Sequence, residues 1–299
     1  MPWPAICRKA HTQLLGCVLC IAVSPAHAQE PLADPPPRPP HHVQTNTRLL
    51  VWGYGVGMAL YGYNAWWQDN TGEFHIEGEG WFGETSYRGG ADKFGHMYTT
   101  YVSTRLLSHA FHRLGNDRPR AQRLASVLVG STTFAIEVLD GYTEDIGFSW
   151  EDLVMDAAGI GAGLVLENRP DLDAKFDFRF HYQRSSAARR LGEEDPASDY
   201  SGQTYLFITK LKGFRALRKY RPLHYVELAL GYGSRGYWPT DGTQTKQRSM
   251  FYGLSLNVLQ VLEDTAFRRR TSGSVQSITR GTLEYIQLPG STALADHAL

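Results

Sequence analysis

The first half of the chain carries apolar residues three or four positions apart, the spacing of a helix with one buried face. Three segments show this spacing: 92–114, 118–141 and 149–170. The third opens with Ser149 three residues ahead of Asp152, which resembles a capping box at the start of a helix. We therefore predict a bundle of two to four helices over residues 48–170.

An apolar run without any charged residue precedes these segments, over residues 49–67. On paper this run is long enough to cross a bilayer. It also contains four glycines, which would allow close helix packing or mark a strand. The run could therefore bury itself against protein or against lipid.

From Lys175 onward the apolar period changes from helical to about two. Bulky apolar residues alternate with polar or small ones over 175–183, 204–214, 224–238, 249–262 and 278–288. This alternation predicts an antiparallel sheet, either packed on the helices or curved as part of a barrel, and we favour the half-buried sheet. The expected fold class is α+β, with an N-terminal helical bundle followed by an antiparallel β region over residues 171–299.

The N-terminus has the pattern of an export signal. An apolar run at 14–23 follows two basic residues and ends shortly before the small residues Ala26 and Ala28. We expect cleavage after Ala28, so that residues 1–28 are a signal peptide and the mature chain is exported to the periplasm or the outer membrane. Residues 29–47 are rich in proline and predict an extended linker.

A lipoprotein box at residues 14–17 is the alternative, but it leaves almost no apolar stretch ahead of Cys17. All three cysteines lie upstream of Ala28, so cleavage there would leave the mature chain without a thiol. Disulfides, thiolate metal sites and cysteine nucleophiles would then be excluded. Lys and Arg together number 30, as do Asp and Glu, and no motif for reading bases occurs, so we expect no nucleic-acid partner.

Ionisable residues stand in the helical segments at positions where leucine would normally be buried. Asp92 and His96 are four residues apart, so they share one face of a helix, and Lys93 lies next to that face. Taken singly, Asp92 could be a helix cap and Lys93 a surface charge.

Two further helices carry acids of the same kind. Glu137 and Asp140 lie at the end of an apolar helix, where the helix dipole disfavours negative charge unless a cation, proton or donor compensates. Asp152 and Asp156 repeat the four-residue spacing on the next helix, whereas Glu151 is expected to point to solvent. Because short loops make the helices neighbours, we expect these residues to meet in one polar pocket.

The pocket allows three interpretations. The acids and one imidazole could hold a hard divalent cation. Alternatively, His96 could act as a general base while Lys93 stabilises negative charge. A buried structural network is the third option. The segment at residues 78–93 could form a loop over the pocket with aromatic side chains, and Glu77, Glu79 and Glu84 are expected to be solvated.

The stretches "GGADKFGHMYTTY" and "EVLDGYTEDIGFSWEDLVMDAAGIGAG" resemble the YfiM-like family of periplasmic lipoproteins, a family of unknown function. They are more distantly similar to VanZ-like membrane proteins. The resemblance covers roughly residues 66–170 and implies an envelope location. It also implies a shared site, with Asp156 standing where Asn is expected. The site residues are Asp92, Lys93, His96, Glu137, Asp140, Ser149 and Asp152.

Two functions follow from these observations. In the first, the chain is a noncatalytic envelope component that docks on a membrane or an envelope partner, and the polar residues fix its packing. In the second, it is a hydrolase or transferase acting on an envelope lipid or glycan through His96 and the carboxylates. We favour the first, because no nucleophile elbow, zinc motif or phosphate loop occurs. The sequence identifies neither a metal nor a cofactor.

Overall fold

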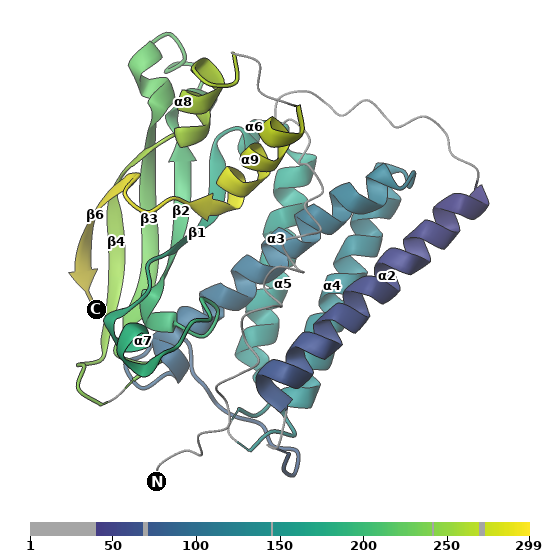
Figure 1. The fold of residues 1–299 in the computed structure, drawn as a ribbon, viewed down its shortest axis with the longest axis vertical. Helices are drawn as coiled ribbons and strands as arrows, with labels where there is room; N and C mark the ends of the chain where they lie inside the picture. Colours follow the sequence, from purple (N-terminus) through teal and green to yellow (C-terminus); the bar gives the residue numbers. More distant parts are fainter. Residues whose placement is uncertain (1–39, 68–70, 145, 241, 269–272) are drawn as a thin grey trace.

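A computed structural model describes residues 40–67, 71–144, 146–240, 242–268 and 273–299, without the side chains of Pro40, Ala65 and Trp66. The predicted signal peptide and the first part of the predicted linker lie outside these ranges. A helical bundle stands beside a curved sheet, and helix α3 lies between the two (Figure 1). The fold class is α+β, as the sequence predicts.

Four long helices form the bundle: α2 (Pro40–Gly62), α3 (Ala91–Arg113), α4 (Arg118–Asp140) and α5 (Trp150–Asn168). A π-helical turn, η1 (Tyr63–Trp67), extends α2. Asp117 caps α4 by accepting a hydrogen bond from the backbone N–H of Arg120, and Ser149 caps α5 in the same way through Asp152. The three helical segments predicted beyond residue 90 are confirmed.

Helix α2 corrects the predicted linker. It begins at Pro40, so residues 40–47, expected to be extended, are helical instead. Proline is compatible with the first turn of a helix, because the N–H that it lacks has no partner there in any residue. Within the described ranges, no helix combines the length and apolar content that crossing a membrane requires.

The bundle is held by an apolar core and by one close helix crossing. Phe111 of α3 packs with Ala125 and Val129 of α4, and side chains of α2 cover this cluster. Helix α5 crosses α3 at Gly159, where an added Cβ would lie 2.1 Å from the carbonyl oxygen of Met97. The absence of a side chain at this position lets the two backbones approach closely, which positions the polar residues at the same end of both helices.

The sheet has six strands in the order β5-β1-β2-β3-β4-β6. They are β1 (Phe176–Tyr182), β2 (Gln203–Lys210), β3 (Val226–Arg235), β4 (Gln247–Leu256), β5 (Ile286–Gln287) and β6 (Thr292–Ala298). All neighbours are antiparallel except β1 and β5. Aromatic side chains of α3 pack on β1 and β2, where Phe94, Tyr98 and Tyr101 contact Phe178 and Tyr205.

Shorter elements complete the fold. The 3-10 turn η2 (Tyr87–Gly90) precedes α3, and α6 (Pro170–Asp173) joins α5 to β1. Between the strands lie the helices α7 (Ser186–Leu191), α8 (Val258–Asp264) and α9 (Gly273–Tyr285) and the 3-10 turns η3 (Tyr200–Gly202), η4 (Leu211–Gly213) and η5 (Arg221–Tyr225). Two of them correct the strand prediction. Residues 258–262 belong to α8, and most of the predicted strand 278–288 belongs to α9. Gly281, Leu283 and Tyr285 are buried in alternation, which imitates the period of a strand although the backbone is helical.

Candidate functional site

The predicted polar residues meet at one end of the bundle, where α3 and α5 begin and α4 ends. Lys93 is at the centre and its side chain is completely buried. Its Nζ lies 2.9 Å from Asp92 Oδ2, 2.9 Å from Asp152 Oδ1 and in direct contact with the carboxylate of Glu79. It also donates to Ser149 Oγ at 3.5 Å. One ammonium group therefore joins carboxylates from α3, α5 and the loop before α3.

The electrostatics of this group favour a charged lysine. Burial lowers the pKa of Lys93, but Asp92, Asp152 and Glu79 more than offset it, so the pKa is raised overall. For the carboxyl group of Asp92, burial has the opposite effect and raises the pKa. Burial also acts to raise the pKa of Asp152, but His96 and Lys93 lower it below its ordinary value. Asp152 is thus the carboxylate of the group that stays ionised most readily.

Glu79 is a site residue that the sequence did not reveal. It was expected to be solvated, but it is buried and paired with Lys93. Burial and the neighbouring Asp152 raise its pKa to about 9. The position of Glu79 depends on Gly90, at the start of α3. Gly90 has a φ of 78°, and a Cβ added to it would lie 2.5 Å from the carbonyl oxygen of Trp81. The loop can therefore fold tightly over the start of α3.

His96 forms a second group with acids of α4 and α5. Its Nδ1 lies 3.2 Å from Asp156 Oδ1 and 3.8 Å from Glu137 Oε1, and its Nε2 lies 3.9 Å from Asp152 Oδ1. Burial lowers the pKa of His96, but the three carboxylates raise it well above its ordinary value. The side chain keeps 31% of its surface exposed, so it is the member of the site most open to solvent.

Glu137 and Asp140 occupy different environments at the end of α4. Glu137 Oε2 accepts a hydrogen bond from the backbone N–H of Ser149 at 3.2 Å, and burial raises its pKa to about 8. Asp140 Oδ1 accepts a hydrogen bond from Trp67 Nε1 at 2.7 Å, and burial raises its pKa to about 6. Asp140 thus ties η1 to the end of α4 and lies at the margin of the site.

Two acids of α5 complete the site. Asp156 is buried, and its Oδ2 has no hydrogen-bond partner in the part of the chain that the structure describes. Glu151, which was expected to point to solvent, is buried and accepts from Ser149 Oγ at 3.5 Å. The buried acids of the site therefore outnumber its two basic residues, Lys93 and His96; these acids are Glu79, Asp92, Glu137, Asp140, Glu151, Asp152 and Asp156.

The cost of burying so many carboxyl groups can be lowered in two ways. Some of the acids can hold a proton, or a cation can join them. Two sets of three side chains lie close enough to share an ion: Glu79, Asp92 and Asp152, and separately His96, Glu137 and Asp156. An exposed imidazole beside a carboxylate can also transfer protons.

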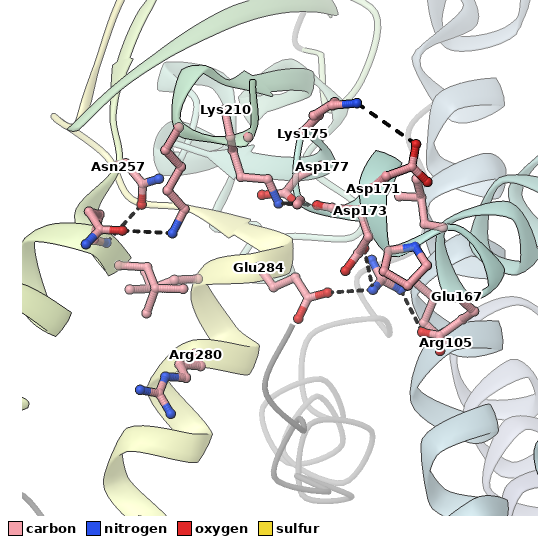
Figure 2. Close-up of a pocket in the computed structure, with 18 of the residues that line it drawn as sticks. Arg105, Glu167, Asp171, Asp173, Lys175, Asp177, Lys210, Asn257, Arg280 and Glu284 are labelled. Atoms are coloured by element: carbon pink, nitrogen blue, oxygen red, sulfur yellow. Dashed lines mark hydrogen bonds and ion pairs between the residues drawn. The ribbon is translucent and has the colours of Figure 1, made fainter. Parts of the chain in front are cut away.

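A second polar region, which the sequence did not reveal, lies between the bundle and the sheet. A cavity of about 1250 Å³ is lined there by charged side chains of α3, the strands and α9 (Figure 2). Arg105 pairs with Glu167 at 3.0 Å and with Asp173 and Glu284 at 2.8 Å each. These partners come from elements far apart in the chain, so no spacing could have predicted them.

The fold and the cluster define an α+β protein whose helical bundle holds a buried acidic site around one lysine and one histidine. Residues 78–168 of this chain match the model of a family described as "Predicted periplasmic lipoprotein (DUF2279)". The matched segment includes every site residue from Glu79 to Asp156. No curated protein and no solved structure matches the chain. The match confirms the predicted export to the cell envelope, while the names YfiM-like and VanZ-like stay predictions.

Proposed function

We propose that this envelope protein lies against a lipid membrane through the outer face of its helical bundle, and that the polar site fixes how the helices pack. The observation that carries this proposal is the outer face of α2. Leu49, Trp52, Val56 and Leu60 follow helical spacing there and are exposed, Trp52 by 72%. The opposite face of α2 packs into the core, so α2 is apolar on both sides. Such a helix needs a second apolar surface.

Helices α4 and α5 also expose apolar side chains. Val127 and Phe134 of α4 and Val154 and Val165 of α5 are also exposed. Large exposed apolar areas mark contacts with membranes or partners.

Basic residues favour lipid over a protein partner. Arg48, Arg120 and Arg123 are exposed, and the hydrogen bond from Asn116 to Thr47 holds the start of α2 beside the start of α4. Cations bordering an apolar face suit anionic lipid headgroups.

Vesicle flotation tests the proposal. The purified mature protein is mixed with vesicles of phosphatidylethanolamine and phosphatidylglycerol, and the floating fraction is measured. The double variant Trp52→Ser, Leu60→Ser should bind at least tenfold more weakly than wild type. Val275→Ser, which changes an exposed apolar residue of α9, is the matched control and should bind as wild type does. All three proteins are produced from Gln29 onward, so that no acyl chain on Cys17 contributes to binding. Equal flotation of all three would contradict the proposal.

The family description also supports a lipid anchor. A lipoprotein signal would be cleaved before Cys17, so that the mature chain would begin at this residue and keep Cys20. An anchor at Cys17 would hold the protein at the membrane surface, where the apolar face of α2 would supply a second contact. Metabolic labelling with a palmitate analogue tests this reading: wild type should be labelled and Cys17→Ser should not.

A hydrolase or transferase of an envelope lipid or glycan is the second candidate. It is favoured by the ring of His96, which is partly exposed and lies 3.2 Å from Asp156. In this reading His96 moves the proton, Lys93 stabilises negative charge, and the remaining site residues orient the two. His96→Ala tests it through envelope phenotype and melting temperature. Loss of phenotype at unchanged melting temperature would support catalysis, whereas parallel loss of both would contradict it.

A further inference from the structure

The two sets of acids at the site differ in how their charge is balanced. Glu79, Asp92 and Asp152 surround the ammonium group of Lys93, which already lies within 2.9 Å of two of them. A metal ion would have to displace that lysine. His96, Glu137 and Asp156 have no lysine or arginine among their ion pairs in the described part of the chain. The second set is therefore the one whose negative charge a metal ion could balance without displacing a lysine.

The ligand atoms of the second set have suitable spacing. Atoms bound at about 2.1 Å to one ion lie about 3.0–3.4 Å apart in octahedral or tetrahedral geometry. His96 Nδ1 lies 3.2 Å from Asp156 Oδ1 and 3.8 Å from Glu137 Oε1, and the three atoms lie within 4.8 Å of one another. The distance between His96 and Asp156 already suits a shared ion, and Glu137 would move closer to complete the coordination.

An independent observation points to a missing partner. Asp156 is 3% exposed, its Oδ1 faces His96, and its Oδ2 has no hydrogen-bond partner among the described residues. A buried carboxylate oxygen without a partner is costly. A cation at this position, or a water molecule bound to it, would satisfy that oxygen.

The surroundings also orient the ligands. The backbone N–H of Ser149 holds Glu137 Oε2, which leaves Oε1 toward His96. Hydrogen bonds of this kind to the outer atoms of ligands are a regular feature of metal sites. The exposed edge of His96 gives an ion a path from solvent.

We propose that His96 Nδ1, Glu137 and Asp156 bind one divalent transition-metal ion, of the kind that accepts one imidazole and two carboxylates, such as Mn²⁺ or Zn²⁺. Three protein ligands leave coordination positions for water. This site goes beyond the membrane-contact function and does not depend on it. With Lys93 neutralising the first set of acids, the ion neutralises the second.

Metal titration of the full mature protein tests the site. Protein treated with a chelator is titrated with Mn²⁺ alone and Zn²⁺ alone by calorimetry, and the melting temperature is measured with and without each ion. We expect one ion per chain and a melting temperature raised by several degrees. Asp156→Asn should weaken binding at least tenfold. Glu144→Gln changes an exposed acid in the turn between α4 and α5, outside the site, and should keep the wild-type affinity within about twofold.

A spectroscopic measurement on wild type makes the test independent of how the variants fold. Bound Mn²⁺ should show electron–nuclear coupling to one histidine nitrogen, and His96→Gln should abolish it. The proposal is overturned if neither ion binds saturably, or if bound Mn²⁺ shows no nitrogen coupling. It is equally overturned if Glu144→Gln weakens binding as much as Asp156→Asn, since that result would indicate diffuse attraction to an acidic surface.

Discussion

Lys93 of α3 and Asp152 of α5 form a buried ion pair, with 2.9 Å between Nζ and Oδ1. Helix α4 separates their two helices in the chain, so the pair is a tertiary contact. Asp92 and Glu79 share the same ammonium group. Buried ion pairs add little stability relative to an apolar replacement of the whole group, but the loss of one partner leaves the others uncompensated. The pair therefore makes the packing of α3 on α5 depend on one lysine.

Lys93→Met should reduce the free energy of unfolding by about 3–5 kcal/mol, because three buried carboxyl groups lose their cation. Urea unfolding followed by circular dichroism measures this change. Lys219→Met is the control, since Lys219 is exposed, and it should change stability by less than about 0.5 kcal/mol. A Lys93→Met protein as stable as the control would show that the acids are protonated and need no cation.

The crossing of α3 and α5 gives a matched pair of glycine variants. Gly159→Ala should reduce the free energy of unfolding by about 1–3 kcal/mol, because the new methyl group meets the Met97 carbonyl and Thr100 Oγ1. At Gly161 no atom lies within 4 Å of an added Cβ. Gly161→Ala should therefore increase stability by about 0.5–1 kcal/mol through helix propensity alone. Chemical denaturation of both variants decides the matter, and an equal effect of the two would contradict the close crossing.

The sequence predicted those elements whose pattern was local. The spacing of apolar residues and the cap at Ser149 predicted the helices, because both signals are local in the sequence. Helix α9 was mistaken for a strand, since its buried residues alternate and a short apolar run fits either period. Strand β6 was missed because its sequence is mostly small and polar, and its pairing with β4 is a tertiary contact.

The same distinction applies to the site. Lys93, His96, Asp152 and Asp156 could be placed together from their helical spacing within each helix and from the short loops, which make consecutive helices pack side by side. Glu79 could not, since its position depends on how a loop folds over Gly90. No local feature marks a loop acid as buried.

Asp140 predicts a dependence of stability on pH. Burial raises its pKa to about 6, although Trp67 and His96 oppose the change. A carboxyl group with a raised pKa contributes stability below its unfolded value near 3.8, and that contribution is lost as the pH rises through 6. Asp140→Asn should therefore be more stable than wild type at pH 7, by about 2–3 kcal/mol, and equal to it near pH 3. Urea unfolding at several pH values measures the difference, and a pH-independent difference would contradict the raised pKa.

Glu167 predicts the opposite dependence at the second polar region. Burial alone would raise its pKa, but His109 and Arg105 more than offset this and lower the pKa to about 2. His109 Nε2 and Arg105 Nε each lie 3.0 Å from Glu167 Oε1. A depressed pKa contributes stability that is present above the unfolded value of 4.5 and is lost as the pH falls through 2.

Glu167→Gln should therefore reduce the free energy of unfolding by about 2–3 kcal/mol at pH 7, and the difference from wild type should shrink as the pH approaches 2. Thermal unfolding at pH 7, 4 and 2.5 measures this trend. Glu194→Gln is the matched control because Glu194 is exposed, and it should follow wild type at every pH. If Glu167→Gln lost the same stability at all three pH values, the loss would come from packing around Arg105. The charge of Glu167 would then contribute nothing to the contact between the bundle and the sheet.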